Sequence, residues 1–133
     1  MPVEDFADFI SSKVPKGKIV ELGIGFQFKV ALRLKELGFD VLAVDWNEES
    51  VRAAIRAGID AFQDDIFNPR RELYRGAVAL YAVRPTPEIL VPIISLSDRL
   101  KLPLFILPLA GDTMPRGMKL VNYRGLPVYA KGI

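Results

Sequence analysis

The sequence predicts one α/β domain, with a mainly parallel sheet, helices on both faces and a C-terminal antiparallel β-hairpin. Two patterns support this fold class. Short apolar runs alternate with amphipathic helical segments as far as residue 107, and the last two strand-like runs flank Arg124-Gly125. The 133 residues, half of them hydrophobic, suit a single core. We therefore expect residues 1–133 to form one domain.

The first half of the chain predicts three helices and three strands. Phe6, Phe9 and Ile10 recur at helical spacing, and Gly38 and Gly58 stand where the two later helices should end. Apolar and β-branched runs between the helices favour strands. The expected elements are a helix over 2–14, a strand over 18–22, a helix over 26–37, a strand over 41–44, a helix over 48–57 and a short strand at 61–62.

The second half predicts a turn, two strands, a helix and the hairpin. Asn68-Pro69 breaks the chain, and a continuous apolar run follows Gly76. The helix that ends near Leu100 has two possible starts, because Pro92 is tolerated in a first turn but disrupts a helix interior. The helix either starts at Pro87 and kinks at Pro92, or begins near Val91. The expected elements are a polar turn or short helix over 70–75, a strand over 77–83, a rigid loop over 84–88, the helix, a strand over 104–107, a loop over 108–117, and hairpin strands over 119–123 and 127–131.

This alternation also predicts where a ligand site would lie. Strand–helix–strand units are right-handed and place successive strands in parallel. In an open sheet of this kind ligands bind outside the carboxyl ends of the strands, at the point where the strand order reverses. We expect the fourth strand beside the first at the centre of the sheet, so the loops after the first four strands should hold any site.

Composition excludes several kinds of chemistry. The chain has neither cysteine nor histidine, which rules out disulfides, thiol nucleophiles and zinc sites built from Cys or His, and we expect no metal. Any side-chain general base must be Asp, Glu, Lys or Tyr. No apolar run reaches the roughly 18 residues of a membrane span, and the acidic start lacks the basic region of a signal peptide. We expect a soluble, cytoplasmic protein with no membrane partner.

Charge is divided unevenly along the chain. Residues 1–65 carry 8 Lys and Arg against 12 Asp and Glu, a net −4, whereas residues 66–133 carry 10 against 4, a net +6. A basic half can meet an anionic partner such as RNA or a phosphorylated metabolite. The alternative is a solvated surface of uneven charge.

Glu21, Gly23 and Gly25 form a Glu-x-Gly-x-Gly turn between the first strand and the next helix. Glycines there let the backbone turn tightly and approach a ligand at a helix N-terminus. The dinucleotide fingerprint needs a third glycine, but that position holds Phe28, so an NAD pyrophosphate fits poorly. An acidic residue before the glycines instead suits a ligand with an ammonium group. The alternative is a tight turn that binds nothing.

Two acidic positions follow the second and third strands. Asp45 stands 20 residues after Gly25, where a carboxylate can accept hydrogen bonds from ribose hydroxyls, and Trp46 beside it can cover an adenine face. Asp64 or Asp65 can accept from the adenine amino group, and we prefer Asp64. Each residue also has a structural alternative. Asp45 would be an ordinary loop carboxylate beside Asn47, which could cap the next helix, and Trp46 would simply pack into the protein. Asp64 and Asp65 would form a solvated acidic turn.

The loop after the fourth strand carries the candidate catalytic residues. Arg84 can bind an anion, and Glu88 can act as a base or pair with Arg84. The prolines between them restrict the backbone. A structural alternative assigns Thr86 as the cap of the next helix with Pro87 at its first position, and pairs Arg84 with Glu88 or Asp64.

Together these residues resemble class I S-adenosylmethionine-dependent methyltransferases. The resemblance covers about residues 17–107 and is carried by the Glu-x-Gly-x-Gly turn, by Asp45 and by Asp64 or Asp65. In that family the first loop holds the methionine part of the cofactor, the second carboxylate holds the ribose and the third contacts adenine. The resemblance implies a Rossmann-like fold and S-adenosylmethionine as cofactor.

The whole chain is similar to a family of small archaeal proteins, uncharacterised protein family 0146. The shared features are the length, the Ile-Val-Glu-Leu-Gly-x-Gly opening, the Val-Asp segment and the Arg-Pro-x-Pro-Glu loop. This resemblance implies a single methyltransferase-like (Rossmann-like) domain.

The chain departs from the methyltransferase pattern near the acceptor. Amino-methyltransferases often carry Asn/Asp-Pro-Pro-Tyr/Phe after the fourth strand, whereas residues 83–88 lack the aromatic residue. The expected elements also include neither the last crossover helix nor a domain that caps a substrate. We therefore expect an S-adenosylmethionine-binding, methyltransferase-like protein that acts on an anionic substrate or RNA, or works as a homodimer or with a partner protein. The alternatives are a non-catalytic nucleotide-binding or regulatory module and a Rossmann-like enzyme using another nucleotide.

Overall fold

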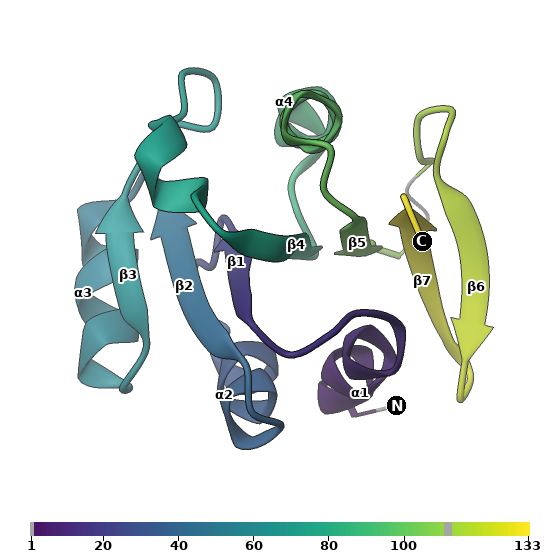
Figure 1. Ribbon diagram of the computed structural model, residues 1–133, viewed down its shortest axis with the longest axis horizontal. Helices are drawn as coiled ribbons and strands as arrows, with labels where there is room; N and C mark the ends of the chain where they lie inside the picture. The colour runs from purple at the N-terminus through teal and green to yellow at the C-terminus, as the bar shows by residue number, and fades with distance from the viewer. Residues whose placement is uncertain (1, 111–112) are drawn as a thin grey trace.

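A computed structural model describes residues 2–110 and 113–133, so residues 111 and 112 of the expected loop over 108–117 lie outside the described residues. A seven-stranded sheet forms the centre of the described chain, in the order β3-β2-β1-β4-β5-β7-β6 (Figure 1). Its strands are β1 (Lys18–Leu22), β2 (Asp40–Asp45), β3 (Asp60–Gln63), β4 (Ala77–Val83), β5 (Leu104–Leu107), β6 (Lys119–Tyr123) and β7 (Leu126–Lys131). The helices are α1 (Glu4–Lys13), α2 (Lys29–Glu36), α3 (Glu48–Arg56), the 3₁₀ helix η1 (Arg71–Tyr74) and α4 (Pro87–Leu100).

The sheet is parallel from β3 to β5 and antiparallel on both sides of β7. Strand β1 pairs in parallel with β2 and with β4, which confirms that the first and fourth strands lie side by side. The chain reverses strand order here, because β2 and β3 lie on one side of β1 while β4 and β5 lie on the other. The β6–β7 hairpin closes the sheet with β7 antiparallel to β5, as the sequence predicts.

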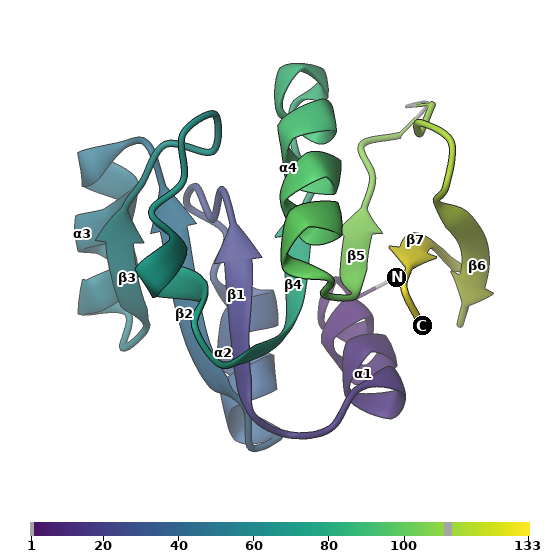
Figure 2. The ribbon, with the colours of Figure 1, turned by 45° about the horizontal axis from the view of Figure 1, so that its top comes forward.

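Helices cover both faces of the sheet. Helices α1, α2 and α3 pack on one face, whereas η1 and α4 pack on the other. Figure 2 shows α4 in front of β4, with α2 behind β1 and β2. Each face has its own apolar core, so most strand residues are buried on both sides of the sheet.

Helix α4 begins at Pro87 and continues through Pro92, which settles the two starts that the sequence left open. Pro87 occupies the first turn, where its missing N–H costs nothing. Thr86 is the N-cap residue of α4, as the structural alternative predicted, but its side chain makes no cap hydrogen bond. Helix α2 begins at Lys29 instead of residue 26, because the backbone around Gly25 turns through positive φ.

No helix in residues 2–110 and 113–133 has the length and apolar character needed to cross a membrane.

Candidate functional site

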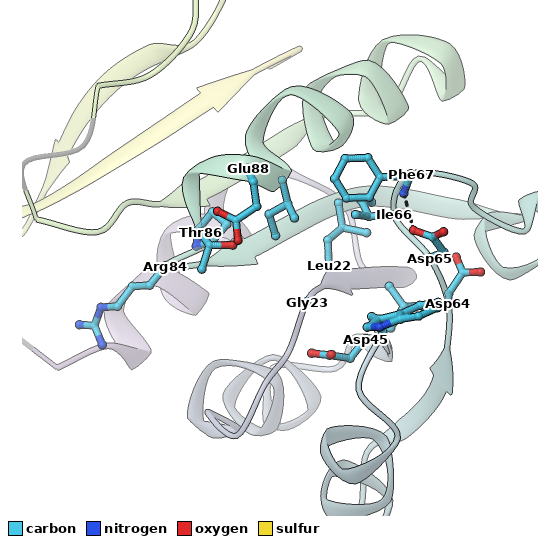
Figure 3. Close-up of a pocket in the computed structure, with 14 residues that line it drawn as sticks. Leu22, Gly23, Asp45, Asp64, Asp65, Ile66, Phe67, Arg84, Thr86 and Glu88 are labelled. Carbon is cyan, nitrogen blue, oxygen red and sulfur yellow. Dashed lines mark hydrogen bonds between the residues drawn. The ribbon is translucent and has the colours of Figure 1, made fainter.

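A cleft of about 580 Å³ opens at the carboxyl ends of β1 to β4, on the α4 side of the sheet (Figure 3). Each of the four loops that the sequence singled out contributes to it, because parallel strands bring their carboxyl ends to one edge. The lining residues are Leu22 and Gly23 at the end of β1; Val44, Asp45 and Trp46 at the end of β2; Asp64, Asp65, Ile66 and Phe67 after β3; and Arg84, Pro85, Thr86, Glu88 and Ile89 after β4.

The glycine turn is fixed to the neighbouring strand. Gly23 and Gly25 have φ values of 71° and 57°, in the left-handed region that favours glycine. The N–H groups of Gly23 and Ile24 donate to the carbonyl of Val44 at 2.9 and 3.3 Å. Gly23 lines the cleft, where its missing side chain leaves the backbone open to a ligand.

Asp45 joins the glycine turn to the start of α3. Its Oδ2 accepts from the Gly25 N–H at 2.7 Å, and its Oδ1 accepts from the Asn47 N–H at 2.8 Å. Each carboxylate oxygen keeps a second lone pair for a ligand. Asn47 caps α3 by accepting from the Glu49 N–H at 2.8 Å, so the capping role belongs to Asn47 and Asp45 faces the cleft.

Two aromatic side chains are exposed at the cleft. Trp46 is 70% exposed and Phe67 is 66% exposed, although large apolar side chains are ordinarily buried. The exposure of Trp46 contradicts the alternative in which it is simply packed into the protein. Together the two rings offer flat apolar surface on the loops after β2 and β3.

Asp64 is largely engaged within the protein. Its side chain is 3% exposed, and its Oδ1 accepts from the backbone N–H and the Nε of Arg70, both at 3.2 Å. The Tyr74 hydroxyl lies 3.5 Å from the other oxygen. Asp65 is half-buried and also lines the cleft, where its Oδ1 accepts from the Phe67 N–H at 2.9 Å. The contacts therefore favour Asp65 over Asp64 as the more accessible carboxylate.

Glu21 lies beneath the glycine turn and does not line the cleft. It is fully buried, and the Tyr81 hydroxyl donates to its Oε1 at 2.6 Å. Its Oε2 has no hydrogen-bond partner within the described part of the chain. Burial raises the pKa of the Glu21 carboxyl to about 8; the Tyr81 hydrogen bond opposes this shift and the nearby charge of Asp45 adds to it.

The loop from β4 to α4 presents Arg84, Thr86 and Glu88 to the cleft. Arg84 has a φ of 48°, unusual for a residue with a side chain, and its N–H donates to the carbonyl of Leu107 at 2.6 Å. Within residues 2–110 and 113–133 Arg84 forms no ion pair, and Figure 3 shows it extending away from Asp45 and Asp64. The expected pairing with Glu88 or Asp64 is therefore absent from the described contacts.

Sequence reasoning missed three polar partners and one aromatic residue of this site. Tyr81 holds Glu21, Arg70 and Tyr74 hold Asp64, and Phe67 lines the cleft. Glu21 and Tyr81 lie opposite each other on the paired strands β1 and β4. Their contact can be predicted only once these two strands are known to be neighbours.

The fold is that of S-adenosylmethionine-dependent methyltransferases. A TehB-like SAM-dependent methyltransferase from Corynebacterium glutamicum aligns with a TM-score of 0.70 at 17% identity, over 98% of this chain and 89% of that chain. An RNA methyltransferase from Salinibacter ruber, solved in complex with S-adenosyl-L-homocysteine, aligns with a TM-score of 0.69 at 17% identity and the same coverage. At this identity the likeness shows the fold alone.

The chain belongs to the Uncharacterised protein family UPF0146, whose model matches residues 3–132. The UPF0146 protein of Pyrococcus abyssi is 53% identical over 125 residues, 94% of this chain and 95% of the relative. The UPF0146 protein of Methanocaldococcus jannaschii is 39% identical over 114 residues, 86% of this chain and 82% of the relative. The family resemblance expected from the sequence is confirmed.

Proposed function

We propose that the cleft binds S-adenosylmethionine and its demethylated product, and that the protein is a methyltransferase or a binding protein derived from that fold. The observation that carries this proposal is the convergence of Gly23, Asp45 and Trp46 on one cleft at the point where strand order reverses. Structural neighbours with S-adenosyl-L-homocysteine or S-adenosylmethionine in their complexes add support.

The residues of the cleft suit the separate parts of this cofactor. The carboxylate of Asp45 can accept from ribose hydroxyls while keeping its two backbone hydrogen bonds. Trp46 and Phe67 provide stacking surface for adenine, and Asp65 can accept from the adenine amino group. The open backbone at Gly23 suits the methionine part of the cofactor.

The methyl acceptor belongs beside Arg84, Thr86 and Glu88, at the β4 side of the cleft. The bound cofactor supplies an electrophilic methyl group, so the protein has mainly to orient the acceptor and exclude water. Arg84 can grip a phosphate or carboxylate of the acceptor, and Glu88 can take a proton from its nucleophile. Both side chains are exposed and available for an incoming substrate.

Titration calorimetry on the purified protein tests the cofactor. We expect S-adenosylmethionine and S-adenosylhomocysteine to bind, and NAD not to bind, because Phe28 replaces the third glycine that a pyrophosphate requires. ATP serves as a further comparison. Tight binding of NAD together with no response to either methionine nucleoside would overturn the proposal.

The Arg84→Ala variant tests the acceptor. Because Arg84 is exposed and forms no ion pair among the described residues, we expect a stability change under about 1 kcal/mol and unaltered affinity for S-adenosylhomocysteine. Binding of an anionic partner, with an RNA oligonucleotide as the probe, should weaken. Arg99→Ala, an exposed arginine in the last turn of α4, is the matched control. Equal RNA binding by wild type and both variants removes Arg84 from the site.

A transfer assay separates the enzyme from the binding module. With radiolabelled S-adenosylmethionine, label should move to RNA or to another anionic acceptor present in an archaeal extract. Cofactor binding without any transfer would instead support a regulatory module that keeps the fold.

A further inference from the structure

Strand β6 forms one edge of the seven-stranded sheet. Within residues 2–110 and 113–133 it pairs with β7 alone, and Figure 1 shows it at the end of the sheet beyond β7. Proteins commonly protect such an edge with a bulge, a proline or several charges, because a free edge can pair with another strand. The five residues of β6 include no proline and one charge, Lys119, and their register with β7 has no bulge. This edge is therefore suited to pairing with a further strand.

The turn of the β6–β7 hairpin determines which backbone groups of β6 face outward. Arg124 and Gly125 have φ values of 53° and 82°, the two positive values of a type I′ turn. The turn joins Tyr123 to Leu126, the last pair of the ladder. In a two-residue hairpin this closing pair is hydrogen-bonded, and along an antiparallel ladder such pairs alternate with pairs that are not. Every second residue of β6, counted from Tyr123, therefore bonds to β7.

The residues between them, Leu120 and Asn122, direct their N–H and C=O groups to the outer side of β6. Pro127 supports this assignment, because it lies opposite Asn122 and has no N–H to donate. A strand that pairs with β6 would hydrogen-bond to these four outward groups. Leu120 is also 57% exposed, on the face of the sheet where its neighbour Tyr129 packs beside the α4 core.

A second copy of β6 matches these outward groups. If two β6 strands run antiparallel about a two-fold axis at Val121, Leu120 of each copy lies opposite Asn122 of the other. Both are then hydrogen-bonded pairs, so every outward N–H of one copy meets an outward C=O of the other. The two Val121 residues form the closer pair between them, with Cα atoms about 4.5 Å apart. The two exposed Leu120 side chains become diagonal neighbours on one face.

The charges near β6 are compatible with this pairing. Lys119 of one copy lies opposite the uncharged Tyr123 of the other, and like charges opposite each other would be destabilising. Arg124, next to Tyr123, is already paired with Asp5 and Asp8, each 3.2 Å away. The lysine of the second copy therefore approaches no unpaired cation at the turn.

We propose that the chain forms a symmetric dimer by antiparallel pairing of its β6 strands, which joins two sheets into one. The proposal goes beyond the proposed function and does not depend on it, because the cleft lies at the ends of β1 to β4 and two strands separate β4 from β6. A pair of five-residue strands is about 17 Å long. Since standard complexes bury roughly 800 Å² per partner, this smaller contact should be reversible and concentration-dependent.

Sedimentation equilibrium at a series of protein concentrations measures the association. We expect the average mass of the wild type to rise from one chain toward two as the concentration approaches about 1 mM. Leu120→Pro removes an outward N–H without removing a hydrogen bond to β7, and should raise the dissociation constant at least about tenfold. Leu120→Thr, the matched control, keeps the N–H and should still dimerise.

A single introduced cysteine tests the register. The chain has no cysteine, so a disulfide can form only between two copies. Val121→Cys places the two Cα atoms about 4.5 Å apart, within the range that a disulfide spans. In Lys119→Cys, the control, the two residues are displaced by four positions along the strands, about 13 Å, which a disulfide cannot bridge. Mild oxidation should link Val121→Cys several-fold more than Lys119→Cys.

Several outcomes would overturn the dimer. A wild type that stays at the mass of one chain contradicts it, and a dimer that persists equally in Leu120→Pro uses another surface. Equal linking of the two cysteine variants contradicts the register, because random collision favours the more exposed residue 119. Should Leu120→Pro not fold, the cysteine variants decide. Titration of Leu120→Thr and Leu120→Pro with S-adenosylhomocysteine should give the wild-type affinity, so failure of the dimer and failure of the cofactor proposal are separate results.

Discussion

Asp45 has two tasks at the scale of single residues. It accepts hydrogen bonds from the N–H groups of Gly25 and Asn47, and thereby links the glycine turn to the start of α3. It also lines the cleft, where its remaining lone pairs face the space for a ligand. A carboxylate fixed by backbone donors is already oriented, so a ligand need not meet the cost of ordering it.

The Asp45→Asn variant tests the ribose contact. It removes the charge and one acceptor, and loss of charge-assisted hydrogen bonds of about 1.5–3 kcal/mol corresponds to roughly a tenfold to hundredfold loss of affinity. Isothermal titration with S-adenosylhomocysteine gives the dissociation constant. Asp40→Asn, at the exposed opposite end of β2, is the control and should bind normally. An unchanged dissociation constant in folded Asp45→Asn would show that Asp45 does not bind the ribose.

Glu21 should make stability depend on pH in an unusual direction. The pKa of its carboxyl rises from 4.5 to about 8 on folding, mainly through burial, so the folded protein keeps a proton that the unfolded chain releases. Its contribution to the free energy of unfolding is therefore fully present below about pH 4.5 and is lost as pH rises towards 8.

Glu21→Gln copies the protonated form and should flatten this dependence. Relative to the wild type, the variant should gain free energy of unfolding between pH 5 and pH 8, on the order of a few kcal/mol. Urea unfolding at a series of pH values measures the change. The exposed Glu72→Gln provides the control. Parallel pH profiles for wild type and Glu21→Gln would show that Glu21 is not protonated in the folded protein.

The turn between β1 and α2 is the element that shapes the floor of the cleft. A Cβ added to Gly23 would lie 3.6 Å from Cδ1 of Ile89, across the cleft, at a φ of 71°. The backbone there is anchored to β2 through the carbonyl of Val44, so it cannot easily relax. Both the conformation and the open space at this position depend on glycine.

Gly23→Ala should therefore lose both stability and ligand affinity. The left-handed conformation costs a residue with a side chain about 1–2 kcal/mol, and the new methyl group occupies ligand space. Gly58→Ala is matched: its φ is 93°, no atom lies within 4 Å of the added Cβ, and it follows α3 away from the cleft. Thermal melting and calorimetry should show a similar stability loss in both variants and an affinity loss in Gly23→Ala alone. Equal affinities would exclude the turn from the site.

The sequence predicted most elements, because local pattern and burial agree along the chain. The bounds of β1, β4, β5 and β6 match the expected ranges, and β3 is longer than the expected pair of residues. The four loops of the cleft were also predictable, since strand ends mark them. The contacts between side chains were not: the Tyr81–Glu21 and Arg70–Asp64 pairs depend on neighbours that only the fold supplies.

The charge asymmetry has a partial explanation at the scale of the whole molecule. Arg124 lies 3.2 Å from both Asp5 and Asp8, and Lys131 pairs with Asp98. Arg70 pairs with Asp64. Some basic residues of the second half are thus paired with acidic residues of the same chain. For these residues the pairs favour the alternative of a solvated surface of uneven charge over an anionic partner. Arg84 lines the cleft and forms no ion pair among the described residues, and the acceptor proposal uses it.

We expect the molecule to unfold as one cooperative unit. Two apolar cores lie on opposite faces, but β1, β4 and β5 contribute to both, so neither core can open without disturbing the shared sheet. A chain of 133 residues is within the size range of two-state unfolding. Far-ultraviolet and near-ultraviolet circular dichroism should give coincident urea transitions. Two separated transitions would show that the faces, or the β6–β7 hairpin, unfold independently.

A crystal structure of the protein grown with saturating S-adenosyl-L-homocysteine tests the central claim most directly. We predict the ligand in the cleft, with ribose hydroxyls within hydrogen-bond distance of Asp45, adenine against Trp46 or Phe67, and the amino-acid end beside Gly23. A ligand bound elsewhere on the molecule, or a cleft that stays empty at saturating ligand, would contradict the account.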